Sequence, residues 1–439
     1  MERSGRRVLP RALAAVGAAT ALLLGVAVLP ASADTVSSIR ATEWWLDSMQ
    51  ASTMWKTSTG SGVTVAVIDS GVNAQHPDLQ GKILAGQNFS ALTGGATADT
   101  DGHGTSIASY IVGTGKGWNG QGMVGLAPDV GIISFRVVAK KDNEAVFAID
   151  FSKQLSAAIR AAADSKAKIL NISMGQDELE PNVRSAVAYA LSKGKMIVAA
   201  AGNSAKMGNP PEYPAAFPGV VAVSSVDKNG TASAESEFGD QVAFAAPGED
   251  MHNACADPSG YCHSSGTSDA TPIVSASAAL LWSVHPSWTA NQIIRVLMDT
   301  TSRSANGQPA AQDPHYGYGI VRPRIALTNP GNPGPADVNP LTGTSTSSTT
   351  DPSAGASVAP TADASAKASS TAPATTAAKK SGSSNSLLWI GLGVAAAVVI
   401  GVVVFLVLRR RNRPGPPPPP PGPPTYPNPY GHIPDPYRQ

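Results

Sequence analysis

Short apolar runs alternate with helical patterns along the middle of the chain. The run VTVAVID at 63–69 is almost continuously apolar and β-branched, which is typical of a parallel strand covered on both faces. Similar runs predict five further strands, at 131–138, 169–174, 196–201, 220–226 and 241–246. This alternation predicts an α/β fold with an open, mainly parallel sheet and helices on both faces.

Helical patterns lie between and after the predicted strands. Residues 151–163 have apolar positions at helical spacing, and 183–193 start just after a proline and stop at a glycine. Thr289 and Gln292 have the spacing of a capping box ahead of an apolar run. Ligands of such folds bind beyond the carboxyl ends of the strands, so Asp69, which ends its strand, lies where chemistry is expected.

The N-terminus has the pattern of a secretory signal peptide. Four arginines precede an apolar stretch that is followed by Ala31-Ser32-Ala33, a site suited to signal peptidase. We therefore expect residues 1–33 to be removed, with an uncleaved anchor helix as the alternative. Residues 34–61 then form a short arm, which we expect to lie on the main domain and to bury its tryptophans.

The C-terminal part predicts a membrane anchor. Residues 329–385 are rich in Pro, Ser, Thr, Ala and Gly and predict a disordered spacer, whose span would be on the order of 40 Å. Residues 387–408 form an apolar stretch long enough to cross a bilayer, followed at once by arginines. This pattern predicts one transmembrane helix, an extracellular main domain and a cytoplasmic, basic and Pro-rich tail at 409–439. The tail either binds an aromatic-lined groove or has no specific role.

Composition and cysteine count narrow the function classes. The net charge is +1, only 14% of residues are charged, and the folded part has no extended basic run, so nucleic-acid binding has no electrostatic support. Cys255 and Cys262 lie close together in one loop. In an exported protein they favour a local disulfide, whereas in a reducing compartment they would be half of a metal site.

Candidate chemistry centres on Ser268 in the segment SSGTSDATP. We expect a helix to open at Thr271 or Pro272, because proline suits a first helical turn, and its free amides would then point toward Ser268. A serine hydroxyl attacks only if a base takes its proton and donors stabilise the oxyanion. Ser268 is therefore a candidate nucleophile, with an ordinary helix cap as the alternative.

His103 is the candidate base. It lies between two glycines in DGHGTS, which allow close approach to its ring. A histidine with a pKa of about 6.5 suits this task if a carboxylate fixes its tautomer, and Asp69 can do so. The remaining histidines lie at turns or element ends and are expected to be solvated rather than catalytic; they are His76, His252, His263, His285 and His315.

Asn203 is the candidate oxyanion donor. It ends the small-residue strand MIVAAAGN, and its side-chain N–H would act with a backbone amide at Ser268, unless it is a simple turn residue. The segment NISMG is expected to present a strand edge to an extended substrate, and the small residues before Asn203 are expected to line side-chain pockets. The residues expected to bind substrate are Ser173, Met174, Gly175, Ala200, Ala201 and Gly202.

The motifs VAVIDSGV, DGHGTS, NISMG, AAAGN and SGTSDATP follow one another as the signatures of the subtilisin-like serine proteases do. This resemblance covers about 63–327, within a protease domain expected at 62–328, and implies a triad of Asp69, His103 and Ser268 with Asn203 as oxyanion donor. We expect no cofactor and no metal. One departure is Asp269, where many subtilisins have an apolar residue. A carboxylate there raises the cost of an oxyanion unless it faces away from the nucleophile.

The order of segments resembles that of the mycosins, which are membrane-anchored subtilisin-like proteases associated with type VII secretion. The resemblance implies a serine endopeptidase that hydrolyses polypeptides at the extracellular face of the cell membrane. It would act on the type VII secretion machinery or together with it. Two alternatives stay open. One is a general cell-surface subtilase that degrades peptides, and the other is a structural subunit of a secretion complex whose hydrolysis is dispensable.

Overall fold

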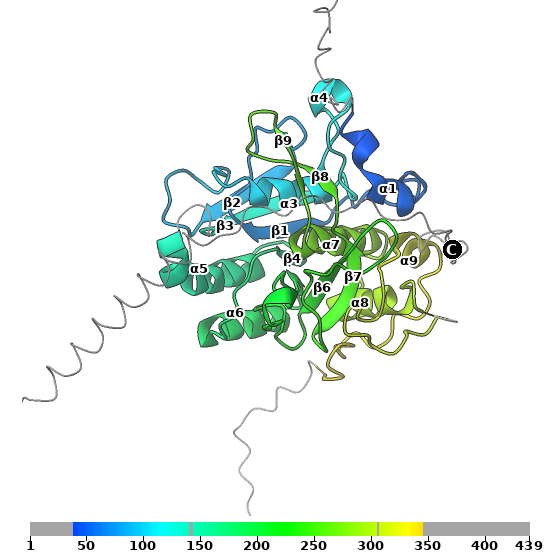
Figure 1. Ribbon diagram of the computed structural model, residues 1–439. Coiled ribbons are helices and arrows are strands. Elements are labelled where there is room, and N and C mark those ends of the chain that lie inside the picture. The colour runs from blue at the N-terminus through cyan, green and yellow to red at the C-terminus, as the bar shows by residue number, and fades with distance from the viewer. Residues whose placement is uncertain (1–37, 140–143, 305–306, 346–439) are drawn as a thin grey trace, which may run out of the picture. The chain divides into compact units, whose positions relative to one another are not determined.

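The computed structural model describes residues 38–139, 144–304 and 307–345. Its centre is a seven-stranded sheet in the order β2-β3-β1-β4-β5-β6-β7, in which every neighbouring pair runs parallel (Figure 1). The strands are β1 Thr64–Asp69, β2 Ile83–Asn88, β3 Gly131–Arg136, β4 Ile169–Ile172, β5 Met196–Ala200, β6 Val221–Val226 and β7 Val242–Pro247. The predicted α/β class with a mainly parallel sheet is confirmed.

Helices cover both faces of the sheet (Figure 1). One face carries α3 His103–Val112, α7 Thr267–Val284, α8 Ala290–Asp299 and α9 Pro323–Thr328, and the other carries α5 Glu144–Asp164 and α6 Pro181–Ser192. Side chains of β1 alternate between the two cores: Val65 and Val67 pack with the α3 and α7 side, and Ala66 and Ile68 with the α5 and α6 side. This two-sided burial explains the continuous apolar run in the sequence.

All six predicted strands are present, each within two residues of its expected ends. Three strands were not predicted. The edge strand β2 is mostly exposed and includes a glycine and a glutamine, so it lacks an apolar pattern. The strands β8 Met251–Ala254 and β9 Tyr261–Ser264 form an antiparallel hairpin whose residues are largely polar. Short polar strands of this kind depend on pairing rather than on hydrophobic periodicity.

Two helix starts follow their sequence signals. The capping box of α8 is confirmed, because the hydroxyl of Thr289 accepts from Gln292 N at 3.4 Å and Gln292 Oε1 accepts from Thr289 N at 3.1 Å. Helix α6 begins at Pro181, two residues before the expected start, since proline fits the first helical position. Helix α5 begins at Glu144, seven residues before the predicted start at 151.

The N-terminal arm packs on the main core through its tryptophans. It contains η1 Arg40–Thr42, α1 Trp44–Ser48 and α2 Ala51–Met54. Trp45 is fully buried, and Trp44 and Trp55 are partly buried against the same core. Trp55 Nε1 also donates to Leu126 O at 2.9 Å. Each indole thereby buries its rings, as expected for side chains of this size.

The first part of the predicted spacer is not disordered. Residues 331–345 lie beside α8, where Thr289 Oγ1 donates to Ala336 O at 2.9 Å and Gln292 Nε2 donates to Gly334 O at 3.0 Å. Leu341 packs against the core. The prediction that the spacer starts at 329 is therefore wrong. These hydrogen bonds join polar side chains of α8 to backbone carbonyls of residues 331–345. Such contacts need no apolar residues at regular spacing, so the sequence pattern did not reveal them.

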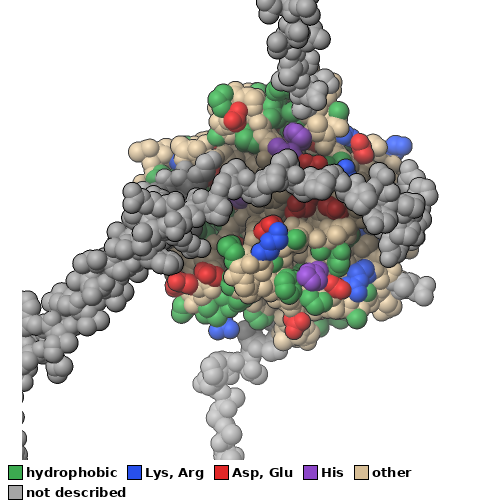
Figure 2. All heavy atoms as spheres, viewed as in Figure 1, with side chains coloured by type: hydrophobic (Ala, Val, Ile, Leu, Met, Phe, Trp, Pro, Cys, Tyr) green, Lys and Arg blue, Asp and Glu red, His purple; other side chains and the backbone are tan. Residues whose placement is uncertain are grey.

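The predicted signal peptide, transmembrane helix 387–408 and tail 409–439 lie outside the described residues. Among the helices of the described part, none is long and apolar enough to span a bilayer. On the face shown in Figure 2, lysine and arginine side chains are scattered and form no continuous basic patch.

Candidate active site

Asp69 and His103 meet at the carboxyl end of β1, a central strand. Asp69 is 1% exposed, and its Oδ1 lies 2.8 Å from His103 Nδ1 and accepts from Ser70 N at 2.8 Å. Because the carboxylate accepts, Nδ1 carries the proton and Nε2 is left as the basic nitrogen. About a third of the His103 side chain remains exposed.

The start of α3 is fixed to the end of β1 by polar contacts. Asp99 accepts from Gly102 N at 2.8 Å, and Ser70 Oγ bridges the two elements by donating to Asp99 at 2.9 Å and accepting from Gly104 N at 2.9 Å. A Cβ at Gly104 would overlap the carbonyl of Gly71. The glycine after His103 therefore serves the close packing of helix and strand, which brings the imidazole to Asp69.

The electrostatics of His103 favour its charged form. Burial alone disfavours the imidazolium, but the combined attraction and hydrogen bonding of Asp69, with smaller effects of Asp269 and Asp101, outweighs burial and raises the pKa of His103 to about 9. A general base must be neutral to accept a proton. Catalysis through His103 would consequently be fastest on the alkaline side of neutrality.

Ser268 lies in the first turn of α7, which corrects the predicted helix start at Thr271 or Pro272. The helix begins at Thr267 because Gly266 has an extended conformation (φ 157) that starts the turn earlier, and Pro272 lies inside the helix. Proline has no N–H for the Ser268 carbonyl. Ser173 Oγ donates to that carbonyl instead, at 3.0 Å.

Asn203 is oriented by the start of the same helix. Its Oδ1 accepts from Thr267 N at 2.9 Å and from Thr267 Oγ1 at 3.2 Å. Thr267 Oγ1 in turn accepts from Gly202 N at 3.2 Å. With Oδ1 engaged, the amide Nδ2 is the free end of this exposed side chain, and it is a donor.

His103, Asn203 and Ser268 line one cleft of about 610 Å³. Ser173, Met174 and Gly175 also line it, as expected. Ala200, Ala201 and Gly202 are instead buried and are not among its lining residues. Strand β5 ends at Ala200, before the cleft begins. This side of the cleft is therefore formed by Asn203 and Ser204, which follow these three residues.

The segment NISMG does not present a strand edge. Strand β4 pairs with β1 and β5 on its two sides and ends at Ile172, so both of its edges are already occupied. Only Ser173, Met174 and Gly175, which follow the strand, are placed to meet a substrate backbone. The expectation of an edge strand was wrong because strand order cannot be read from a single apolar run.

Glu212 and Glu237 are among the cleft residues that sequence reasoning missed. Burial, together with the charges of Glu237 and Asp177, raises the pKa of Glu212 to about 8. Burial also raises the pKa of Glu237 to about 7, although the hydrogen bond from the backbone amide of Ser204 opposes this. Both lie in irregular segments far from the motifs, so no local pattern pointed to them.

Asp269 does not face solvent but is buried beneath the cleft. Ser264 Oγ donates to its Oδ2 at 2.6 Å, and Asn253 Nδ2 joins the cluster by donating to Ser264 Oγ at 2.8 Å and to Tyr110 OH at 3.0 Å. Burial raises the pKa of Asp269 to about 6. Its carboxylate is therefore mostly ionised at neutral pH, and its negative charge favours the protonated form of His103.

His76 corrects a second expectation, because it is buried rather than solvated. It is 4% exposed, and its Nε2 lies 2.8 Å from Gly260 O while its Nδ1 accepts from Asp78 N at 3.2 Å. Its ring also meets the edge of Tyr261. The histidine supports the β8–β9 hairpin, a contact between segments distant in sequence.

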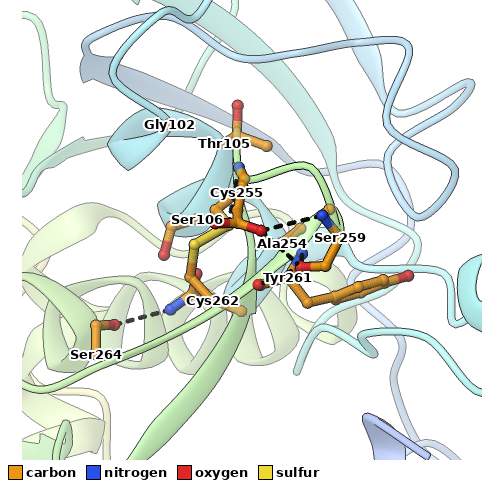
Figure 3. Close-up of a disulfide and its surroundings, with 12 residues drawn as sticks. Gly102, Thr105, Ser106, Ala254, Cys255, Ser259, Tyr261, Cys262 and Ser264 are labelled. Atoms are coloured by element: carbon orange, nitrogen blue, oxygen red, sulfur yellow. Dashed lines mark hydrogen bonds between the residues drawn. A yellow bond between two sulfur atoms is a disulfide. The ribbon is translucent and has the colours of Figure 1, made fainter.

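The same hairpin is closed by a disulfide between Cys255 and Cys262, with Cα atoms 5.8 Å apart. Figure 3 shows this bond beside Gly102, Thr105 and Ser106 at the start of α3. A Cβ at Gly102 would lie 2.9 Å from the backbone nitrogen of Ala256. The disulfide loop therefore packs directly against the helix that carries His103.

Comparison with known proteins agrees with this geometry. The subtilase family model matches residues 60–319. The chain belongs to the subtilase family. Thermitase of Thermoactinomyces vulgaris is 35% identical over 233 residues, covering 53% of this chain and 79% of thermitase. Subtilisin E of Bacillus subtilis (strain 168) is 31% identical over 271 residues, covering 61% of this chain and 66% of its own. The chain is a serine endopeptidase.

Solved subtilase structures include mycosins. The MycP3 protease from the type VII (ESX-3) secretion system is 31% identical and superimposes with a TM-score of 0.56 over 65% of this chain and 88% of its own. MycP1 from Mycobacterium smegmatis is 29% identical, with a TM-score of 0.55 over 67% of this chain and 86% of its own. Fervidolysin from Fervidobacterium pennivorans, a keratinolytic enzyme, is 27% identical. It superimposes with a TM-score of 0.56 over 67% of this chain and 46% of its own. The subtilase's fold is therefore subtilisin-like, with mycosins among its structural neighbours.

Proposed function

We propose that this subtilase cleaves polypeptides through a triad of Asp69, His103 and Ser268, with Asn203 as oxyanion donor. The observation that carries the proposal is the 2.8 Å contact of His103 Nδ1 with Asp69 at the mouth of a cleft that Ser268 also lines. The carboxylate fixes the tautomer, and the basic nitrogen is free to act on the hydroxyl. An imidazole and a hydroxyl that line one cleft, with a buried carboxylate behind the imidazole, have the parts of an acyl-transfer site.

In this mechanism His103 Nε2 takes the proton of Ser268 Oγ as that oxygen attacks the substrate carbonyl. The oxyanion that forms accepts a hydrogen bond from Asn203 Nδ2 and from the backbone amide at the start of α7, which has no intrahelical acceptor. His103 then gives its proton to the leaving amine as the C–N bond breaks. Water, activated by the same imidazole, hydrolyses the acyl-enzyme and restores the hydroxyl.

The test is reaction of the detergent-purified full chain with a serine-directed fluorophosphonate. Wild type should be labelled, and both Ser268→Ala and His103→Ala should lose labelling, because only an activated hydroxyl attacks phosphorus at a useful rate. Ser204→Ala is the matched control, since Ser204 lines the same cleft and should leave labelling intact. Labelling that persists in Ser268→Ala would rule out the assigned nucleophile.

The cellular setting of the enzyme is part of the same proposal. The signal-peptide pattern at 1–33 and the apolar stretch 387–408 with its following arginines support export of the protease domain and a single-pass anchor. The likeness to MycP3, a protease from a type VII secretion system, supports a role on or with such machinery. The substrates would then be exported polypeptides, cut at extended segments such as linkers and termini.

This setting is tested by comparing cells that carry wild type, Ser268→Ala or a deletion. N-terminal peptide mapping of the released proteins should show termini that depend on Ser268. The solubilised protein should migrate with a large membrane assembly. If secretion fails only in the deletion and no exported protein changes its termini, the chain serves as a structural subunit. If it migrates alone while cleavage persists, it is a general surface subtilase.

A further inference from the structure

An unpaired carboxylate lines the cleft beside the proposed nucleophile. Glu237 is 1% exposed, and its Oε1 accepts from Ser204 N at 3.2 Å. Its Oε2 is buried and has no hydrogen-bond partner among the described residues. Burial of a carboxylate oxygen without a partner is costly, so this oxygen is placed to accept from a donor group that enters the cleft.

Glu212 supplies a second carboxylate to the same cleft, and each of the two carboxylates lies close to a glycine. A Cβ at Gly175 would overlap Glu212 Oε1, and a Cβ at Gly202 would overlap the carboxyl group of Glu237. Both glycines follow sheet strands, β4 and β5, whose ends form the site. The acidic groups therefore occupy the floor between these two strand ends rather than the outer surface.

This floor adjoins the nucleophile directly. Ser173, two residues before Gly175, donates to the carbonyl of Ser268. Asn203, next to Gly202, is bonded to Thr267, the residue before Ser268. When the substrate carbonyl lies between Ser268 and Asn203, the substrate residue that contributes this carbonyl lies over the two carboxylates. This is the residue on the acyl side of the cleaved bond.

No positive side chain neutralises this floor in the described part of the chain. Neither Glu212 nor Glu237 is in an ion pair there, and the charges that act on Glu212 are those of Glu237 and Asp177, all acidic. These like charges, added to burial, account for the raised pKa of Glu212. Within the described residues no three acidic, histidine or cysteine side chains could hold a metal ion. A basic side chain of the substrate would supply the positive charge that the described residues do not bring to this floor.

The walls above the carboxylates suit a long side chain with a charged end. Met174, Phe147 and Pro210 line the cleft along with the two glutamates. The aliphatic stem of lysine or arginine packs on apolar walls while its end reaches polar partners. We propose that this endopeptidase cleaves after lysine or arginine, with Glu212 and Glu237 recognising the basic side chain, an inference that rests on the proposed function of Ser268.

The experiment uses the detergent-purified full chain and four fluorogenic peptides that differ only in the residue before the cleaved bond: arginine, lysine, glutamine or leucine. The kcat/KM values for arginine and lysine should exceed the value for leucine by about 10- to 100-fold, the range of a charge-assisted contact. Equal or faster cleavage after leucine or glutamine would overturn the inference.

Charge-removing variants assign the effect to the two glutamates. Glu212→Gln with Glu237→Gln should lower kcat/KM for arginine and lysine toward the leucine value, because glutamine keeps the shape of each side chain but removes its negative charge. Glu235→Gln is the matched control, since Glu235 pairs with Lys206 on the surface and does not line the cleft. Unchanged basic preference in the double variant would remove both residues from the recognition site.

Fluorophosphonate labelling separates this inference from the proposed function. If wild type is not labelled at Ser268, both fail. If labelling occurs, peptide aldehydes ending in argininal or leucinal compete for Ser268 without any need for turnover, and the argininal form should protect at about 10-fold or more lower concentration. Better protection by leucinal would overturn the basic preference while the nucleophile assignment stands. Labelling of each variant also shows that it is folded.

Discussion

The hydroxyl of Ser173 donates a hydrogen bond of 3.0 Å to the main-chain carbonyl of Ser268. In a regular helix this carbonyl would accept from the residue four positions later, which is Pro272 and has no N–H. A side chain that directly follows β4 thus replaces a helical hydrogen bond in the turn that carries the proposed nucleophile. Asn171 extends the link by donating to Ser173 Oγ at 3.1 Å and accepting from Ser275 Oγ at 2.7 Å.

We predict that Ser173→Ala lowers the free energy of unfolding by about 1 to 3 kcal/mol and slows fluorophosphonate labelling, since the carbonyl of Ser268 loses its partner. Pro272→Ala restores an N–H four residues after Ser268. Ser173→Ala should therefore cost less in the Pro272→Ala background, as measured by a double-mutant cycle in urea unfolding. An equal cost in both backgrounds would show that the hydrogen bond does not couple the two sites.

Asn203→Ala should lower kcat by about 100- to 1,000-fold while Ser268 remains reactive, because the variant removes one donor to the oxyanion but leaves the nucleophile and its base. The measurement is steady-state turnover of a peptide amide beside fluorophosphonate labelling. Asn229→Ala, in an exposed turn outside the cleft, is the control and should retain full turnover. A similar kcat for both variants would refute the role of Asn203.

The pH dependence should reveal the influence of Asp269 on His103. In wild type, kcat/KM should rise with pH until His103 loses its proton, at a pKa of about 9. Asp269, with a pKa of about 6, is ionised over this range and favours the imidazolium. Asp269→Asn removes that charge, so the acid limb should move to lower pH by on the order of 1 unit and activity at pH 7 should increase. A shift to higher pH would contradict this electrostatic role.

The disulfide between Cys255 and Cys262 should resist thiol reagents. Neither cysteine of the unreduced, denatured protein should react, and both should react after reduction. Replacing both with alanine should cost at most about 2 to 3 kcal/mol, because the closed loop is short. Since the loop packs on the start of α3, the same variant should also slow labelling of Ser268. Full reactivity of both thiols before reduction would exclude the bond.

The sequence by itself indicated six of the seven strands of the main sheet and the candidate reacting groups. Burial on both faces of a parallel sheet forces continuous apolar runs, so the strands were readable from 63–69 to 241–246. The glycines around His103 and the order of the motifs indicated the candidate residues before any geometry was known. Local signals such as the capping box at Thr289 were reliable because both partners lie within one turn.

Only the tertiary structure decided the surroundings of those groups. The early start of α7 and the replacement bond from Ser173 depend on two segments that are distant in sequence. The burial of His76 and Asp269, and the placing of Glu212 and Glu237 in the cleft, likewise arise where loops from separate strands converge. Hydrophobic periodicity reports which face of an element is covered, but not which loop covers it. Charge and burial at the site, which depend on those loops, therefore follow from packing alone.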